Sequence, residues 1–149
     1  MEAVCILSFC YAFMFESGYT DRQMDLRIDT CVDVATSAER HSVDPALAIA
    51  VSHVESGFQR KAVSSAGARG PMQVMTRFWC KSKSCNLIDA GMRALKTYTE
   101  KSGTRDGLCQ YFSGKVCKRS RQRKRYRDKV LRFADRASLI YSETCIYGC

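Results

Sequence analysis

Apolar positions along most of the chain recur every three or four residues, which predicts helices and few strands. Residues 21–42 carry such a pattern on a polar background and predict a first helix. Asp44 and Pro45 then predict a helix start, because Asp is a favoured N-cap and Pro suits the first helical position. The following stretch, ALAIAVSHVES, is apolar on most sides and ends at Gly57, so we expect a buried helix there.

Beyond Gly57, loop patterns alternate with further helical ones. Residues 62–71 are rich in Ser and Gly and predict a loop, and a short polar loop is expected between Cys80 and Cys85. Gly103 and Gly107 are expected to interrupt the helical pattern. Helices are predicted over residues 72–79, residues 86–101 with Asn86 as N-cap, and residues 125–141. The predicted fold class is therefore mostly α, a single domain with a buried central helix.

The N-terminus carries an apolar run over residues 4–15, which is shorter than the about 20 residues that span a bilayer. Its length suits the core of a signal peptide, but Glu2 stands where a basic residue is usual and no A-x-A cleavage site follows. An export signal, an anchor and a helix packed on the domain all stay open. We accordingly separate an N-terminal segment, residues 1–20, from a main domain, residues 21–149.

The net charge of +9 is concentrated in one segment of this 149-residue chain. Residues 115–136 contain 11 Lys and Arg against Asp128 and Asp135, and the rest of the chain is neutral. Attraction to anionic polymers of the cell envelope and a merely solvated face are the two leading interpretations. Nucleic-acid binding is the weakest, because no recognised nucleic-acid motif accompanies the basic residues.

Nine cysteines favour an oxidising, extracytoplasmic compartment and local disulfides, although spacing alone does not give the connectivity. They fall mostly as near neighbours: Cys5 and Cys10, Cys80 and Cys85, Cys109 and Cys117, Cys145 and Cys149, with Cys31 apart. An odd count leaves one thiol free or paired between chains. A metal site is disfavoured, because no C-x-x-C occurs and neither His41 nor His53 is spaced as a ligand with a cysteine.

Glu55 is the candidate for chemistry. It lies in the last turn of the apolar helix, where the helix dipole and desolvation both raise the pKa of a carboxyl group. A carboxylic acid that keeps its proton near neutral pH suits the general acid of a glycosidase. A Glu on the exposed side of a helix end is the alternative for such a residue taken alone.

The residues around Glu55 resemble the signature of the soluble lytic transglycosylases. VESGF is followed by Ser64 and then by GARGPMQ, in the order of the family's E-S, serine and G-x-x-G-x-M-Q elements. Further downstream, NLIDAGMRAL resembles the N-x-x-x-G-x-x-x-L helix, YFSG falls where Y-N-x-G is expected, and RYRDKV resembles the tyrosine-bearing helix that follows. The resemblance covers about residues 31–135. It implies a lysozyme-like domain related to goose-type lysozyme.

The family's site residues carry over by position. Glu55 matches the single catalytic acid/base, and Tyr111 matches a tyrosine that hydrogen-bonds and orients it. Ser64 matches a serine that touches the N-acetyl group, and Gly67 and Gly70 suit a backbone passing close to a sugar. The implied substrate-binding residues are Ser56, Ser64, Gly67, Gly70, Met72, Gln73 and Tyr111. No cofactor and no metal are implied, and we expect a monomer.

No acid occurs between Glu55 and Asp89, and Asp44 lies about 16 Å away along the same helix at 1.5 Å per residue. A single-acid mechanism is therefore favoured over one with paired carboxylates. The resemblance implies non-hydrolytic cleavage of the β-1,4 bond between N-acetylmuramic acid and N-acetylglucosamine, which leaves 1,6-anhydro ends.

Two other functions stay open. A muramidase would need a second carboxylate from Asp89, Glu100 or Asp106. A non-catalytic module could dock on the wall within a secretion or conjugation machine or a phage particle, an interpretation that Phe112 keeps alive because it replaces the family's Asn.

Overall fold

The computed structural model describes residues 3–146 of the chain, so Glu2 and Cys149 lie outside the described residues. Its elements, in chain order, are α1 (Ala3–Glu16), α2 (Asp21–Arg40), α3 (Pro45–Ser56), β1 (Ala68–Arg69), β2 (Val74–Met75), α4 (Thr76–Trp79), α5 (Leu87–Ser113), α6 (Arg121–Tyr141) and a π-helical turn, η1 (Ser142–Ile146). The prediction of a mostly α fold is confirmed. The helices predicted over residues 21–42, 86–101 and 125–141 are also present, with shifted ends.

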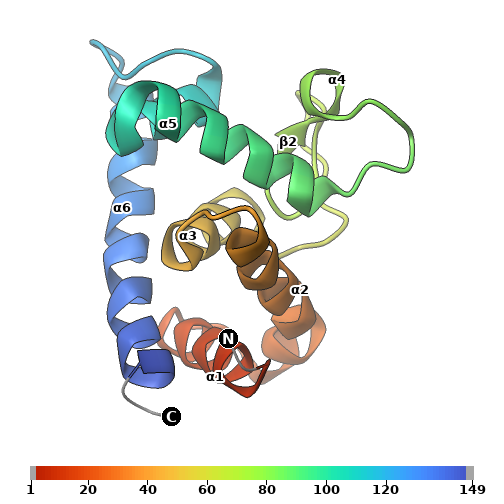
Figure 1. Cartoon of the computed structure of the whole chain (residues 1–149), viewed down its shortest axis with the longest axis vertical. Helices are drawn as coiled ribbons and strands as arrows, with labels where there is room; N and C mark the ends of the chain where they lie inside the picture. The colour runs from red at the N-terminus through yellow and green to blue at the C-terminus, as the bar shows by residue number, and fades with distance from the viewer. Residues whose placement is uncertain (1–2, 147–149) are drawn as a thin grey trace.

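Helix α3 lies at the centre of the molecule, surrounded by α1, α2, α5 and α6 (Figure 1). It begins as expected, since the Asp44 carboxylate accepts a hydrogen bond of 2.9 Å from the Ala46 amide. It ends at Gly57, whose φ of 60° is left-handed. The seven consecutive residues 46–52 are all buried, which confirms the prediction of a buried central helix.

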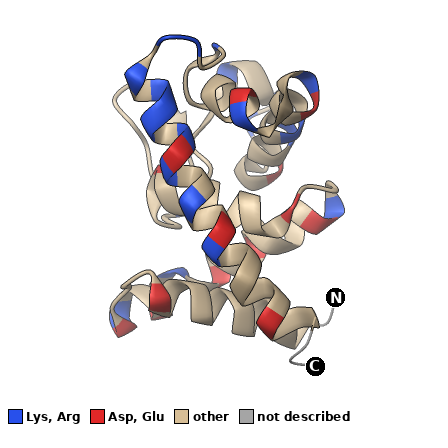
Figure 2. Cartoon of the chain, turned by 90° about the vertical axis from the view of Figure 1, so that its left-hand side faces the viewer, with Lys and Arg blue, Asp and Glu red and all other residues tan. Residues whose placement is uncertain are grey.

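Helix α6 covers one side of α3 with an apolar face and turns a basic face outward. Its buried residues are Tyr126, Val130, Ala134, Ala137 and Ile140. Lys and Arg are numerous along the first half of the helix and in the turn before it (Figure 2). The basic segment, residues 115–136, therefore has one face in the core and one face in solvent.

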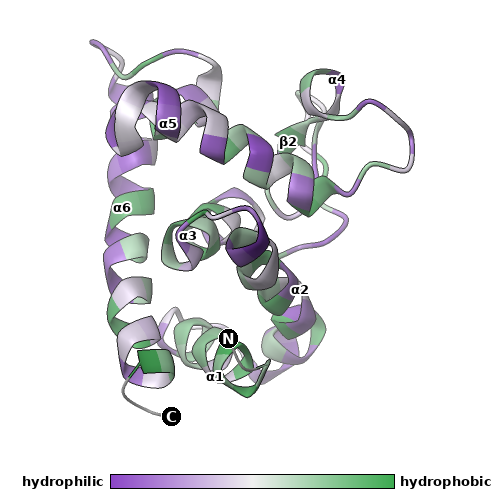
Figure 3. Ribbon diagram, in the orientation of Figure 1, coloured by the Kyte–Doolittle hydropathy of each residue, from purple (hydrophilic) through white to green (hydrophobic). Residues whose placement is uncertain are grey.

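Helix α1 packs into the domain with one side only. Phe9, Phe13 and Met14 are fully buried, whereas apolar side chains on the other side, including Leu7 and Phe15, are exposed. Figure 3 shows that the helix is apolar along almost its whole length. The structure thus contains a packed helix at residues 3–16, and an export or anchoring role stays a prediction. Within residues 3–146, no helix has both the length and the apolar character needed to cross a membrane.

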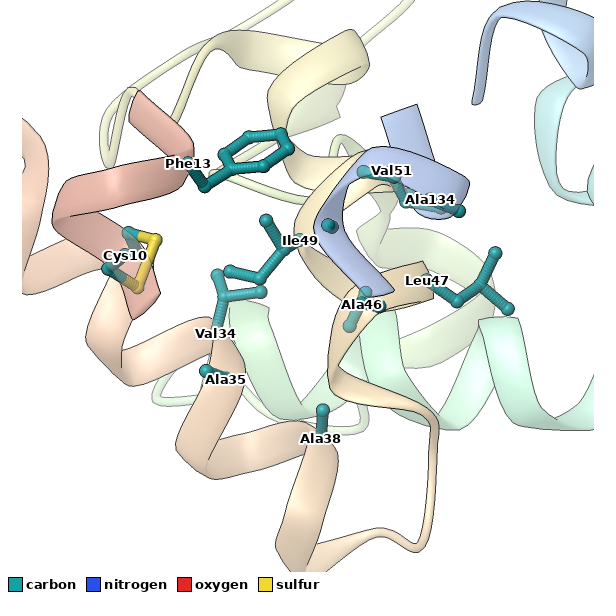
Figure 4. Packing of buried hydrophobic residues seen from close by; sticks show 14 of the residues in the cluster. Cys10, Phe13, Val34, Ala35, Ala38, Ala46, Leu47, Ile49, Val51 and Ala134 are labelled. Carbon is teal, nitrogen blue, oxygen red and sulfur yellow. A yellow bond between two sulfur atoms is a disulfide. The ribbon is translucent and has the colours of Figure 1, made fainter. Parts of the chain in front are cut away.

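The core joins α1, α2, α3 and α6. Figure 4 shows Ile49 of α3 pointing into the space between Phe13 of α1 and Val34 of α2. Ala35 and Ala38 are small residues on the face of α2 toward α3, and Ala134 of α6 lies beside Val51. These small side chains allow the surrounding helices to pack closely around α3.

The prediction of a helix over residues 72–79 is wrong for its first half. Gln73 has a left-handed φ of 50°, which no α-helix contains. Residues 74–75 instead form β2, which pairs with β1 in the register Ala68 to Met75 and Arg69 to Val74. Only the single turn of α4, Thr76–Trp79, is helical.

Element α5 consists of two helices joined by a kink at Gly103, whose φ of 76° and ψ of 166° are not helical. The interruption predicted at Gly103 is therefore confirmed, and the first helix corresponds to the one predicted over residues 86–101. Gly107 lies inside the second half, where a Cβ would come within 2.7 Å of the Thr99 backbone. The interruption predicted at Gly107 is therefore wrong, because Gly107 lies within the second helix, where it allows close contact with the first.

Four disulfides connect the described residues. The local pairs Cys80–Cys85 and Cys109–Cys117 are as expected. The other expected neighbours do not pair with each other, because Cys10 bonds to Cys31 and Cys5 bonds to Cys145. The reason is tertiary packing, since α1 lies against α2 and η1, and its cysteines meet those elements.

Candidate active site

Glu55 receives a hydrogen bond from Tyr126 across the α3–α6 contact. The Tyr126 hydroxyl donates to Oε1 of Glu55 over 2.6 Å. The tyrosine side chain is buried, and the ring of Phe112 stacks on it with centroids 4.7 Å apart and an interplanar angle of 19°. Glu55 thus belongs to α3 and is oriented by Tyr126 of α6, and the Tyr126 ring is covered by Phe112 of α5.

Burial raises the pKa of Glu55 to about 7, and the hydrogen bond from Tyr126 opposes this shift. Burial also raises the pKa of Tyr126 well above its usual value, and the charge of Glu55 acts in the same direction. The phenol therefore stays protonated and donates, while the carboxyl group exchanges a proton near neutral pH. This is the electrostatic arrangement of a group that can act first as an acid and then as a base.

The expectation that Tyr111 hydrogen-bonds Glu55 is wrong. Its hydroxyl donates instead to the carbonyl oxygen of Met72 over 2.6 Å. Burial raises the pKa of Tyr111 well above its usual value, and the charge of nearby Glu55 acts in the same direction. The carboxyl group is oriented by Tyr126, which belongs to the RYRDKV segment singled out in the sequence.

The two serines near Glu55 hold the chain in place. The Ser56 hydroxyl donates to the carbonyl oxygen of Pro71 over 2.8 Å, and buried Ser52 donates to the same oxygen over 3.1 Å. These bonds fix the loop of residues 57–73 against the end of α3. Ser64 accepts from the Ala68 amide over 3.0 Å and so shapes the turn of that loop.

Met72 does not line a cleft, contrary to the expectation, because its side chain is fully buried. It packs on Gly91 of α5, where a Cβ would come within 2.4 Å of the Met72 Cβ. Gly70 is also required by packing, since a Cβ there would lie 2.9 Å from Leu87 and its φ is 77°. Gly67 differs from both: nothing lies within 4 Å of its Cβ position, so its surroundings are open.

A cavity of about 270 Å³ lies between the β1–β2 loop, α4 and α5. Its lining includes Gln73, Arg77, Phe78, Trp79, Tyr98, Gln110, Tyr111 and Phe112. Phe112 lines the cavity and also stacks on Tyr126, the tyrosine that donates to Glu55. Aromatic rings and amides in one recess suit a sugar, which offers apolar faces and hydroxyl groups.

Two amides in this cavity differ in their partners. The Gln73 side chain donates to the carbonyl oxygens of Ala62 and Gly70, so it is fixed in place. Gln110 has a buried Oε1 with no hydrogen-bond partner among the described residues. Sequence reasoning missed Gln110, Trp79 and Tyr98, because a single aromatic or amide on a helix carries no signal beyond packing.

The three acids considered as a second carboxylate are engaged elsewhere. Asp89 accepts from Ser37 and Arg40 through Oδ1. Asp106 accepts from the Cys117 amide, and Glu100 lies 3.9 Å from Lys96 on the surface of α5.

A family model described as the transglycosylase SLT domain matches residues 34–130, about two thirds of the chain. The chain belongs to this family. No curated protein and no solved structure matches it. The matched span begins in α2, ends in α6 and contains Glu55, Tyr111 and Tyr126, whereas α1 lies outside it. The SLT family cleaves peptidoglycan, and the acid with its tyrosine lies inside the matched domain.

Proposed function

We propose that the protein is a peptidoglycan lytic transglycosylase in which Glu55 is the only acid/base. The proposal rests chiefly on the hydrogen bond from Tyr126, which orients the Glu55 carboxyl group. Burial raises the pKa of this oriented group to about 7. It is supported by the engagement of Asp89, Glu100 and Asp106 with other groups. A retaining or inverting hydrolase would need a second carboxylate at about 5–9.5 Å.

In the proposed reaction, protonated Glu55 gives its proton to the oxygen between N-acetylmuramic acid and N-acetylglucosamine. The bond from that oxygen to the muramic C1 breaks, and the acetamido oxygen of the same sugar stabilises the cation. Glu55, now a carboxylate, takes the proton of the C6 hydroxyl, and that oxygen bonds to C1 as the 1,6-anhydro ring closes. No water is consumed. The Tyr126 hydrogen bond stabilises the carboxylate form between the two proton transfers.

The substrate residues then divide by role. Gln73 and Tyr111 border the cavity, and the open surroundings of Gly67 leave room for a glycan beside Ser64. Ser56, Gly70 and Met72 act on the substrate indirectly, because their contacts fix the loop. A role of Phe112 at the sugar is compatible with its exposure of 44%.

The protein would act outside the cytoplasm, where peptidoglycan lies, and four disulfides are compatible with that compartment. The outward face of α6 would attract anionic polymers of the envelope, and nucleic acid is not proposed as a partner (Figure 2). We further propose that the chain acts as a monomer. Work within a secretion or conjugation machine or a phage particle would be compatible with a small wall enzyme.

The decisive experiment digests purified peptidoglycan and identifies the products by mass spectrometry. Wild-type protein is expected to release muropeptides with 1,6-anhydro ends, and Glu55→Gln is expected to release none. Glu16→Gln, which changes an exposed acid at the end of α1, serves as the control. Products that have gained a water would identify a muramidase, and a wild-type protein without products would identify a wall-docking module.

A further inference from the structure

The central part of the chain has a charge imbalance that the neutral total outside residues 115–136 conceals. Residues 56–88 contain six Lys and Arg and no Asp or Glu. Arg60 is neutralised by an ion pair with Asp33 of α2. Arg69, Arg77, Lys81 and Lys83 are exposed, and none of them has an ion-pair partner within residues 3–146.

These four residues gather with Arg93 around α4 and the loop that follows it, and we call the five the basic wall. One groove of about 380 Å³ is lined by Arg69, Arg77 and Lys83. A second, of about 610 Å³, is lined by Phe78, Trp79, Lys81 and Arg93. Arg77, Phe78 and Trp79 also line the cavity that contains Phe112, so both grooves share residues with the proposed sugar site. Figure 1 shows α6 near one end of α5 and α4 with its loop near the other end, so the basic wall is separate from the basic segment.

The backbone that carries the basic wall is held by one internal disulfide and by two contacts with α5. The Cys80–Cys85 disulfide closes the loop. Arg93 donates to the carbonyl oxygen of Trp79 over 2.7 Å, and the Trp79 ring meets Tyr98 of α5 edge-on at 5.7 Å. Because the backbone is held, a ligand that binds Arg77, Lys81 and Lys83 does not need to order the loop that carries them.

Peptidoglycan carries negative charge next to the sugar that would occupy the cavity. The lactyl group of each muramic acid carries a short stem peptide with free carboxylates, and a muramic acid in the cavity must direct that peptide onto an adjoining surface. The acid that lines the larger groove, Asp89, would not repel it, because Ser37 and Arg40 already bind its Oδ1. We propose that the basic wall binds the stem-peptide carboxylates, so that the enzyme selects peptide-bearing strands over bare glycan. This inference rests on the proposed function.

The test uses the Glu55→Gln protein, which binds without turnover, and a synthetic muramyl peptide titrated by calorimetry. The control ligand is the same peptide with its carboxylates amidated. We expect about fivefold tighter binding of the free acid, the effect of one or two exposed charge pairs. Lys81→Gln with Lys83→Gln should abolish this difference. Arg22→Gln with Lys101→Gln removes equal charge from exposed positions on α2 and α5 and should preserve it.

Equal affinity for the two ligands would overturn the inference, as would an equal loss of the difference in the control protein. Competition by polyphosphate as strong as that by the free-acid peptide would also overturn it, because the wall would then be a general polyanion surface. None of these outcomes touches the reaction type, which the 1,6-anhydro products decide separately. Wild-type digestion of stem-bearing and amidase-stripped strands gives the second readout, with a preference of about fivefold expected for the former.

Discussion

The hydroxyl of Tyr126 and the carboxyl group of Glu55 meet at 2.6 Å, although 71 residues separate them in the chain. The contact depends on the packing of α3 on α6. Any change in the angle between these helices would therefore move the acid relative to a bound glycan.

Tyr126→Phe should lower the rate and raise the pKa of Glu55. The phenylalanine keeps the stack with Phe112 but removes the hydrogen bond that lowers the pKa of the acid. We expect kcat to fall about tenfold or more, the usual effect of losing a hydrogen bond to a charged group. In a pH profile of kcat/KM, the limb where Glu55 loses its proton should move to higher pH.

Tyr111→Phe is the matched comparison for Tyr126→Phe. It removes the bond to the Met72 carbonyl oxygen and should affect the rate through the loop, without moving the Glu55 limb. An unmoved limb in Tyr126→Phe would contradict the assignment of the orienting tyrosine.

Two titrating groups on α3 should give opposite pH dependences of stability. The folded Glu55 has a pKa raised to about 7, so the native state binds more protons than the unfolded state from about pH 4.5 to 7. Its contribution to the free energy of unfolding is present at low pH and is lost as pH rises. Burial and the charge of Lys129 lower the pKa of His53 to about 4, so its contribution is present above about pH 6.5 and is lost on acidification.

In the wild-type protein these contributions largely cancel between about pH 4.5 and 6.5. Relative to wild type, Glu55→Gln should gain stability as pH rises through this range, by at most about 3 kcal/mol. His53→Gln should lose stability over the same range. Urea unfolding of the disulfide-intact proteins at several pH values measures both slopes, and parallel curves for all three proteins would refute the two pKa assignments.

Gly91→Ala should destabilise the protein although alanine is the better helix former. A Cβ at this position would lie 2.4 Å from the Met72 Cβ, so α5 must move away from the loop. We expect the free energy of unfolding to fall by about 1–3 kcal/mol, which is typical of overpacking. Urea unfolding measures this fall as a lower midpoint. Helix propensity alone would raise the free energy of unfolding by about 1 kcal/mol. A rise of that size would show that the loop moves aside at no energetic cost.

The sequence was informative where the signal is local. The Asp44 cap, the apolar run and Gly57 define α3 within a few neighbouring residues, so the position of Glu55 in the last turn of α3 could be predicted. The partner of Glu55 could not, because it depends on how α6 packs. Met72 has the motif's spacing, but the left-handed Gln73 beside it belongs to a loop that buries the Met72 side chain, and no periodicity reports that.

Cysteine pairing had the same limit. Neighbouring cysteines in a loop, such as Cys80 and Cys85, can meet without help from the fold. Cys5 and Cys10 lie on one helix, and each instead faces the element packed there. Their partners follow from the placement of α1, which a short apolar run does not determine.

Removal of a disulfide should destabilise the protein more, the longer the segment of chain that the disulfide encloses. The sequence separations are 140 for Cys5–Cys145, 21 for Cys10–Cys31 and 5 for Cys80–Cys85. Loop-closure entropy predicts losses of about 5, 3 and 2 kcal/mol when each pair is changed to serine. Urea unfolding of the three double variants measures them, with free thiols assayed to confirm the remaining bonds. A loss for Cys80–Cys85 as large as that for Cys5–Cys145 would mean that native contacts of the α4 loop, and not the entropy of the unfolded chain, set the contribution of its disulfide.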